Sequence, residues 1–380
     1  MTIRCRIPPL EVTASKDARS QSPKTRWLQS IAAILSRCYA SAVITLRDVA
    51  READCSVATA SRALSHGIHV DTLTRDRVRQ AAERLGYRSN LLARSLRKQK
   101  TGTVGLVIPT LDKLNYAAAV KLLHDELSAH DYQLILCCHR DDPELEAKAL
   151  RALAERQVDA IVHVPFSAAG ASGVLGRDIS IPIVELSRRS TAANVDAVIG
   201  DDHLGGYEAA RHLLENGHRR LALVIGDDRL TTMARRKSGF ERAVIEAGLP
   251  PSDWSVRSDT SSIGWARDTT AALLESDLRP TGLIAGSNQL SVGLVRAVQE
   301  AGLSTPKNVS LVAFSNADWC EILSPPITSY EIPQAEMGHM AAQLLLNRLH
   351  PAIDYDLQPR IVSFAGRLVR RDSVGPPPAN

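Results

Sequence analysis

Short apolar runs rich in β-branched residues alternate with longer amphipathic stretches from residue 103 onward. This alternation constrains the fold more than any other feature, because continuously apolar strands must be buried on both faces of a sheet. Strands are expected at 104–108, 133–138, 160–164, 181–186, 197–200, 221–225, 282–285 and 309–314, and helices near 115–129, 143–156, 206–216, 233–248, 264–276, 288–302 and 334–349. About 270 residues of this pattern exceed one compact sheet, so we predict an α/β body of two lobes, each a doubly wound parallel sheet.

Residues 44–89 show a different pattern, in which short stretches of helical period are separated by residues typical of turns. Thr45, Ser56 and Thr74 are residue types that cap helix N-termini, and each precedes an apolar pattern of helical period. Gly86 ends the third pattern, as glycine often does at a helix C-terminus. Two helices joined by a tight turn and followed by a third predict an N-terminal helix-turn-helix domain.

The charge is distributed unevenly along the chain. Residues 1–43 carry 7 Lys and Arg against 2 Asp and Glu, residues 44–100 carry 12 against 6, and the remaining residues carry 27 against 34. A basic head on an acidic body favours a polyanionic partner at the N-terminal end only. The alternative is a solvated basic surface without such a partner.

The two ends of the chain are expected to lie outside the folded domains. Residues 1–43 contain prolines and serines that break any regular pattern, so we expect either a disordered basic arm or a mis-assigned start, with translation beginning near Val43. Residues 376–380 are expected to form a mobile tail.

Several functions are disfavoured by what the sequence lacks. No apolar run reaches the roughly 18 residues that cross a bilayer. The six cysteines show no CxxC spacing, which predicts reduced thiols in a cytoplasmic protein. There is no GxSxG nucleophile elbow, and His203 and His212 do not have a metal-binding spacing on one helix face. We therefore expect no cofactor, no metal and no enzyme activity.

The second helix of the N-terminal domain, near 57–64, carries side chains suited to DNA. Val57 and Ala58 stand at its start, where they can pack on thymine methyl groups, and Arg62 has the length and fork to pair with guanine. Short polar groups beside them suit phosphates, which position a protein without specifying sequence. The predicted DNA contacts in this domain are Thr45, Ser56, Val57, Ala58, Thr59, Ser61, Arg62 and His69. The alternative is an ordinary capped helix pair, which the basic linker that follows disfavours.

The stretch from Thr45 to Leu64 resembles the LacI/GalR family of transcriptional repressors, and the similarity continues over most of the chain. It includes the patterns Asn90-x-x-Ala93-x-x-Leu96, Gly217-His-Arg-Arg-Leu-Ala222 and Ser324-Pro-Pro-Ile-Thr328. The resemblance implies that residues 90–101 are a linker containing a hinge helix that forms only on DNA. It implies that Asn90, Ala93, Leu96 and Arg97 line the minor groove, with Leu96 as the wedge that opens a base step. The alternative for Leu96 is a core leucine.

For residues 102–375 the resemblance implies a periplasmic-binding-protein-like body that dimerises and closes on a small effector. Its lobes are expected to span approximately 102–202 plus 334–361, and 203–333 plus 362–375. At the place where sugar-binding members carry an arginine, this chain has Ala234 followed by Arg235. Serine or asparagine also stands where those members carry carboxylates.

These departures suggest an effector that is not a simple neutral sugar. We hypothesise a carboxylate or phosphate group, as in a sugar acid or a phosphorylated metabolite. The predicted effector contacts are Tyr116, Arg140, His163, Ser187, Arg188, Arg235, Asp259, Ser287, Asn288 and Ser315. The alternative for the arginines is that they are ordinary surface residues.

Together these features predict a dimeric or tetrameric DNA-binding regulator, a repressor, in the nucleoid of a bacterial cytoplasm. It would bind a pseudo-palindromic operator and respond allosterically to its effector. Two alternatives stand beside this prediction. A solute-binding protein would need an export signal and no DNA-binding head, and an α/β enzyme would need a nucleophile, base or metal set.

Overall fold

The computed structural model describes residues 44–64, 70–87, 100–111, 114–169, 181–191, 194–352 and 358–379. The chain divides into two compact units, Met1–Arg94 and Ser95–Asn380, which we call the head and the body. None of the described helices is both long and apolar enough to span a membrane.

The described part of the head contains three helices that pack on one another, α2 (Leu46–Glu52), α3 (Val57–Leu64) and α4 (Thr72–Leu85). Its core is made of small side chains, as suits helices of two to four turns. The buried apolar residues are Val49, Ala50, Ala53, Ala60, Ala63, Val78, Ala81 and Ala82. The three-helix domain expected from the sequence is therefore present.

Capping decides where α4 begins and ends. Asp71 lies in extended backbone, and its carboxylate accepts the backbone N–H of Thr74 at 2.9 Å. The helix therefore starts at Thr72, and the expectation that Thr74 is its N-cap was wrong, because Asp71 supplies the acceptor three residues earlier. Gly86 ends the helix in the left-handed region, with φ 64°, as predicted.

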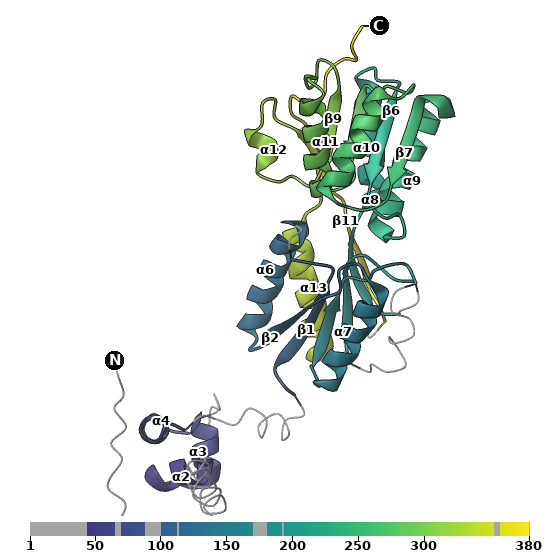
Figure 1. Ribbon diagram of the computed structural model, residues 1–380. Coiled ribbons are helices and arrows are strands. Elements are labelled where there is room, and N and C mark those ends of the chain that lie inside the picture. Colours follow the sequence, from purple (N-terminus) through teal and green to yellow (C-terminus); the bar gives the residue numbers. More distant parts are fainter. Residues whose placement is uncertain are drawn as a thin grey trace, which may run out of the picture. The chain divides into compact units, whose positions relative to one another are not determined.

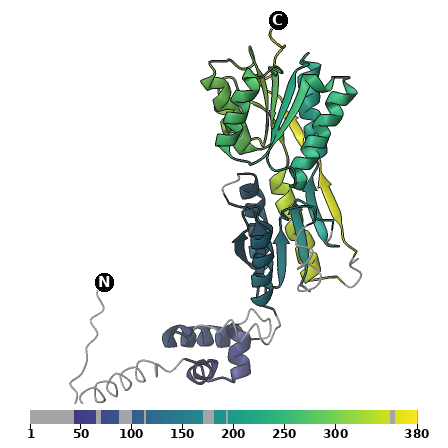
Figure 2. The same ribbon diagram turned by 45° about the vertical axis from the view of Figure 1, so that its right-hand side comes forward.

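The first lobe of the body is built on a six-stranded sheet in which all neighbours are parallel. From edge to edge its strands are β11 (Ile361–Phe364), β5 (Asp196–Gly200), β4 (Ile183–Ser187), β3 (Ala160–His163), β1 (Thr103–Ile108) and β2 (Gln133–Cys138). Helices α6 (Leu114–Ala129) and α13 (Gln334–Leu349) lie side by side on one face (Figure 1, Figure 2). Helix α7 (Pro143–Glu155) covers the other face.

The second lobe has the same plan. Its sheet runs β12 (Arg367–Val369), β10 (Thr328–Glu331), β9 (Ser310–Phe314), β8 (Gly282–Ala285), β6 (Leu221–Ile225) and β7 (Trp254–Ser258). Only β12, at the edge, is antiparallel to its neighbour. One face carries α8 (Asp202–Glu215) and α9 (Thr231–Glu246), and the other carries α10 (Ile263–Glu275) and α11 (Asn288–Glu300). Two short helices, η1 (Pro251–Asp253) and α12 (Trp319–Ile322), complete it.

The chain passes between the lobes after β5, after β10 and after β11. Strand β11 pairs in parallel with β5. Residues 362–364 therefore belong to the sheet of the first lobe and not to the second lobe, where the sequence analysis placed them. The two doubly wound parallel sheets predicted from the sequence are confirmed by this arrangement.

Candidate nucleic-acid interface and ligand cleft

The first residues on the outward face of α3 point away from the core of the head and are exposed. Val57 is 43% exposed, and Ala58 and Arg62 are exposed one turn apart, while Ala60 and Ala63 face the core. An apolar side chain left in water at the start of a helix costs hydration free energy unless a partner covers it. This face therefore combines apolar contact area with one long guanidinium, as a helix that enters a major groove does.

Hydroxyl groups surround the start of α3. Ser56 Oγ accepts the Thr59 backbone N–H at 3.0 Å and lies 2.8 Å from Thr59 Oγ1. The Thr45 hydroxyl donates to the Asp48 carboxylate at 2.7 Å, and this bond and the Thr45 backbone N–H lower the pKa of Asp48. These hydrogen bonds fix the positions of the polar side chains at the amino ends of α2 and α3. Of the other predicted DNA contacts, Ser61 is half-buried on α3, and His69, Asn90, Ala93, Leu96 and Arg97 lie outside the described residues.

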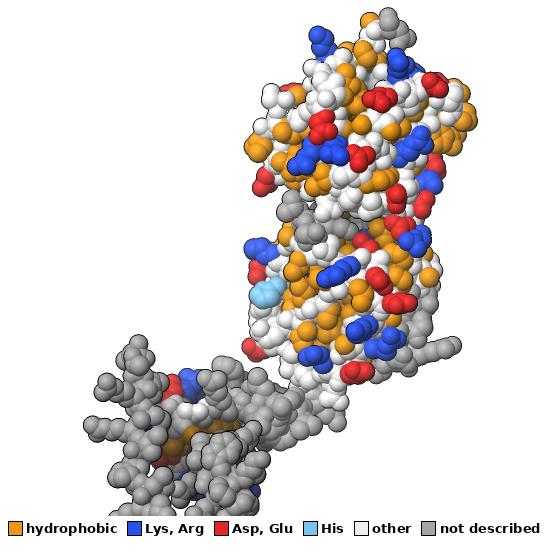
Figure 3. All heavy atoms as spheres, viewed as in Figure 1, with side chains coloured by type: hydrophobic (Ala, Val, Ile, Leu, Met, Phe, Trp, Pro, Cys, Tyr) orange, Lys and Arg blue, Asp and Glu red, His pale blue; other side chains and the backbone are white. Residues whose placement is uncertain are grey.

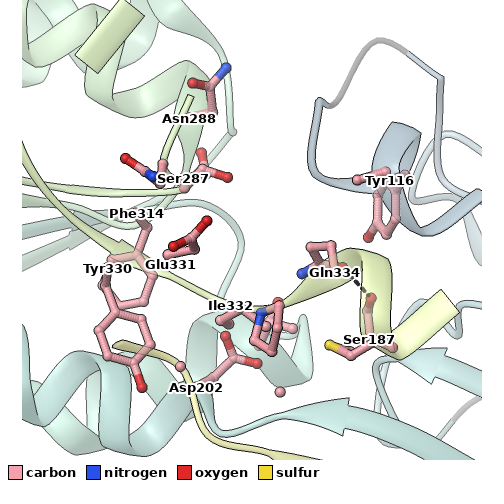
Figure 4. Close-up of a pocket in the computed structure, with 18 of the residues that line it drawn as sticks. Tyr116, Ser187, Asp202, Ser287, Asn288, Phe314, Tyr330, Glu331, Ile332 and Gln334 are labelled. Atoms are coloured by element: carbon pink, nitrogen blue, oxygen red, sulfur yellow. Dashed lines mark hydrogen bonds between the residues drawn. The ribbon is translucent and has the colours of Figure 1, made fainter. Parts of the chain in front are cut away.

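A cavity of about 610 Å³ lies between the two lobes of the body. Figure 4 shows Tyr116 and Ser187 of the first lobe facing Ser287 and Asn288 of the second. Ser187 ends β4, and Ser315 directly follows β9, so the cavity lies at the carboxyl ends of parallel strands. Ligands bind at this edge in doubly wound sheets.

A second cavity of about 730 Å³ continues the first, because Ser261 and Gln289 line both. Its wall includes Arg140 and Asp259. We call the two cavities together the cleft. No histidine of the described residues lines either part of it.

Charged side chains line the first cavity in equal numbers, with three arginines and three carboxylates. These are Arg188, Arg236 and Arg367, and Asp202, Glu331 and Glu336. Most of them are already paired within the body. Arg236 contacts Asp202 at 2.6 Å, and Arg367 contacts Glu331 at 2.7 Å. On the outer face of the body shown in Figure 3, basic and acidic side chains are likewise interspersed.

The pair of Arg236 and Asp202 is the most enclosed of these. The Arg236 guanidinium lies 4.4 Å from the centre of the Phe314 ring and also donates to the Gly286 carbonyl. Burial raises the pKa of the Asp202 carboxyl, and the neighbouring Arg236 opposes that rise. A ligand in the cleft thus meets a guanidinium that is held in place by stacking and by a buried carboxylate.

Four of the eight non-glycine residues with positive φ in the described part of the chain line the cleft. Ser187 has φ 62° and Ser315 has φ 81°, and the adjacent Arg140 and Asp141 have φ 57° and 56°. Non-glycine residues rarely occupy this left-handed region, and such residues cluster at functional sites, where the surrounding structure over-determines them. The cleft therefore contains strained backbone from both lobes.

One residue of the first lobe packs in the core of the second. Phe166 follows β3, yet its ring belongs to the apolar cluster that contains Leu230 and Met233. The guanidinium of Arg229 lies 5.4 Å from the Phe166 ring centre, and the buried Glu146 accepts the Phe166 backbone N–H at 2.8 Å. Phe166 is therefore a direct apolar contact between the lobes beside the cleft.

Sequence comparison identifies both units. Residues 45–90 match the model of bacterial regulatory proteins of the lacI family, and residues 210–374 match a periplasmic binding protein-like domain. Catabolite control protein A of Priestia megaterium is 29% identical over 303 residues, covering 80% of this chain and 91% of that protein. The HTH-type transcriptional repressor PurR of Aliivibrio fischeri is 29% identical over 334 residues, covering 87% and 98%. The chain therefore joins a DNA-binding domain of the lacI family to a periplasmic binding protein-like domain.

Solved structures of LacI-family proteins share the fold. The Lac repressor dimer bound to operator and an anti-inducer matches with a TM-score of 0.78 at 21% identity, covering 87% of this chain and 99% of that one. A LacI-family regulator from Enterococcus faecium with bound ribose matches with a TM-score of 0.65 at 28% identity, covering 72% and 99%. The protein is thus a helix-turn-helix, DNA-binding transcriptional regulator with an effector-binding domain of the LacI family.

The structure brings most of the predicted effector residues of this LacI-family body together. Tyr116, Ser187, Arg188, Ser287, Asn288 and Ser315 line the first cavity, and Arg140 and Asp259 line the second. His163 does not reach the cleft, because it is fully buried with Nε2 2.8 Å from Glu146 Oε1. Arg235 lines neither cavity, because α9 turns it outward, where it is half exposed and lies 3.4 Å from Asp201.

Sequence reasoning missed the arginine that α9 does supply. Arg236, not Arg235, faces the cleft, three residues before Gly239 and four before Phe240. Counting back from this Gly-Phe pair by one helical turn identifies it. Asp202 was missed because the start of α8 was expected at residue 206, four residues too late. Its signal was the Asp201-Asp202 pair directly after a buried strand.

Proposed function

We propose that this LacI-family regulator is a repressor whose affinity for its operator is set by a small molecule held between the two lobes of the body. The observation that carries the proposal is the cleft, because a ligand that touches both lobes favours one closure angle over others. In our proposal that closure angle controls whether two hinge segments meet over DNA. The effector and the operator are then linked through one conformational equilibrium.

On the DNA side, we assign α3 to the major groove. Val57 and Ala58 would contact bases at the start of the helix, and Arg62 would pair with a guanine. The exposure of these three side chains supports this assignment. The residues Asn90, Ala93, Leu96 and Arg97 are assigned to the minor groove on the family resemblance.

The functional unit in this proposal is a homodimer, or a tetramer of two such dimers, because a two-fold operator is matched by a two-fold protein. It acts in the cytoplasm, where the nucleoid is accessible. The effector belongs to the sugar acids or phosphorylated metabolites, a class that the arginines of the cleft support.

We propose no catalytic role for the cleft. Its serines have no histidine or lysine beside them to act as a general base, since neither residue type is among the described lining residues. The Ser287 hydroxyl is also occupied as the N-cap of α11, where it accepts the Leu290 N–H at 3.4 Å.

Fluorescence anisotropy tests the proposal most directly. The full chain is titrated onto duplexes tiled across its own upstream region and onto shuffled duplexes of equal composition, at fixed salt. The expected result is one pseudo-palindromic segment bound at least a thousand-fold more tightly than its shuffled counterpart, as specific regulators bind. Equal binding to all duplexes, with and without added sugar acids and sugar phosphates, would refute the proposal.

A further inference from the structure

Arg188 is a buried arginine that uses only part of its hydrogen-bonding capacity. Its side chain is 3% exposed and lines the first cavity. Nη1 donates to Asp141 at 2.6 Å and to the Pro165 carbonyl at 3.4 Å. Among the described residues the buried Nε has no partner, and none of the hydrogen bonds that this guanidinium makes with them involves Nη2. A buried donor without an acceptor is costly, and the Nε–Nη2 edge of an arginine matches the two oxygens of a carboxylate.

The amino end of α13 opens into the same cavity. Gln334, Ala335 and Glu336 line it. Pro333 precedes this 16-residue helix and has no side-chain acceptor to cap it. The N–H of Gln334 is taken by the Ile332 carbonyl, whereas no acceptor among the described residues takes the N–H of Ala335 or of Glu336.

Ser187 joins these two features. It is the chain neighbour of Arg188, and its hydroxyl donates to Gln334 Oε1 at 3.4 Å (Figure 4). An uncapped helix N-terminus attracts negative charge, and here it lies beside an arginine with an unused edge. The two donors come from different elements, so the arrangement is a built site and not one helix end alone.

The charge of the cavity limits what this site accepts. Three arginines and three carboxylates line it, so its formal charge is already balanced. One additional negative charge at Arg188 is compensated by the helix end, whereas the second charge of a phosphate dianion would exceed what this balanced cavity compensates. We propose that Arg188 and the amino end of α13 seat a single carboxylate of the effector. This inference rests on the proposed function and narrows it from acids in general to carboxylates held at this one place.

Calorimetry with the full chain tests the ligand class. The probes are D-gluconate, D-galactonate, D-glucuronate and D-galacturonate, each compared with its neutral alditol and with its phosphate ester. The expected result is that at least one carboxylate binds about ten- to a hundred-fold more tightly than its neutral and phosphorylated counterparts, as one charge-assisted bidentate contact predicts. Tighter binding of a neutral or phosphorylated probe overturns the proposal, and so does a panel in which no carboxylate binds.

Two variants test the seat itself. R188Q should lower the affinity for the carboxylate by about ten- to a hundred-fold, so that the carboxylate binds no more tightly than its alditol. D141N keeps an acceptor for Nη1 but removes its charge, so carboxylate binding should tighten by about three- to ten-fold. A merely structural role of the pair would weaken binding in both variants. D141N alone decides the question if R188Q does not fold.

R235Q is the matched control, because Arg235 lies on the same body but outside the cleft. It should bind the carboxylate as the wild type does, and an equal loss in R235Q and R188Q overturns the assignment. Operator binding is measured separately on the wild type without ligand. If operator preference is present and the carboxylates fail, only the seat is wrong; if operator preference is absent, the proposed function fails whatever the calorimetry shows.

Discussion

His218 shows what burial does to one titratable side chain in this protein. The ring is fully buried, with Nδ1 2.9 Å from the Thr281 hydroxyl and Nε2 2.9 Å from the Gly375 carbonyl. Burial lowers the pKa of His218 below its ordinary value of 6.5. At a pH between the folded-state pKa and 6.5, His218 carries a proton in the unfolded chain that it lacks in the folded chain. Stability is therefore greatest above pH 6.5 and falls as the pH drops toward the folded-state pKa.

The variant H218Q isolates this effect from other buried groups. We expect the free energy of unfolding of the wild type to fall more steeply between pH 7.5 and 5.5 than that of H218Q, by about 1 kcal/mol over the range. Urea unfolding followed at several pH values measures both slopes. Parallel curves, offset by a constant cost of the substitution, would show that His218 takes up its proton equally in both states.

Arg62 carries the second prediction about a single side chain. If its guanidinium pairs with one guanine, R62A should lose about 1–3 kcal/mol of discrimination at that base pair and little at the others. Anisotropy on a set of single-base operator variants measures this. R84A is the matched control: it removes an equal charge from an exposed arginine of α4 that pairs with Glu52 at 3.4 Å. Equal loss of base preference in both variants would contradict the assignment of Arg62.

Among the elements, strands with continuous apolar runs were predictable, including β2 at a sheet edge, whereas the edge strands β7 and β11, which contain polar residues, were not. The runs at 221–225 and 309–314 contain β6 and β9 because central parallel strands must be apolar throughout. Strands β7 and β11 lie at edges and alternate with polar residues, so their short patterns resemble loops. Strand β10 is polar but buried, because Thr328 bonds to Ser373 and Arg371 of the distant C-terminal segment.

The crossing of α8 and α9 supplies a prediction about two packed elements. A Cβ at Gly239 would overlap the His203 carbonyl of α8, and one at Gly206 would overlap the Arg236 carbonyl of α9. The helices therefore approach each other at a pair of glycines. G239A should destabilise the body by about 1–3 kcal/mol through overpacking. Urea unfolding followed by tryptophan fluorescence tests this, since Trp254 and Trp265 lie in this lobe.

The control for this crossing is G264A. Gly264 lies in the first turn of α10, and a Cβ there meets nothing within 4 Å. The substitution should leave stability unchanged or raise it by roughly 0.5 kcal/mol, because alanine loses less backbone entropy than glycine. If both variants lose the same stability, close approach of α8 and α9 is not the cause.

For the whole molecule, the cleft could be predicted only in part. Its walls come from both lobes, and the chain crosses between the lobes three times. The serines at strand ends were identifiable, since Ser187 directly follows the expected strand 181–186, and Ser287 comes two residues after the run 282–285. The pairing of Arg236 with Asp202 was not, because it depends on how α9 lies against the start of α8. Phe166 was missed for the same reason, as a loop residue of one lobe that packs in the core of the other.

The final prediction concerns the coupling between the effector and the operator. If one equilibrium links them in a homodimer with two clefts, the factor by which a saturating carboxylate effector changes the operator Kd must equal the product of the factors by which saturating operator changes the effector Kd of the two clefts. Couplings of this kind are typically about 5- to 150-fold. Anisotropy with and without effector gives the first factor, and calorimetry with and without operator DNA gives the second. A shuffled duplex should leave the effector Kd nearly unchanged.

The equality between the operator factor and the effector product holds whether the effector releases the repressor or recruits it, because a ligand shifts an equilibrium only by its differential affinity for the two states. A bound effector that changes operator affinity by less than two-fold would show that the cleft and the DNA-binding head are not coupled as proposed.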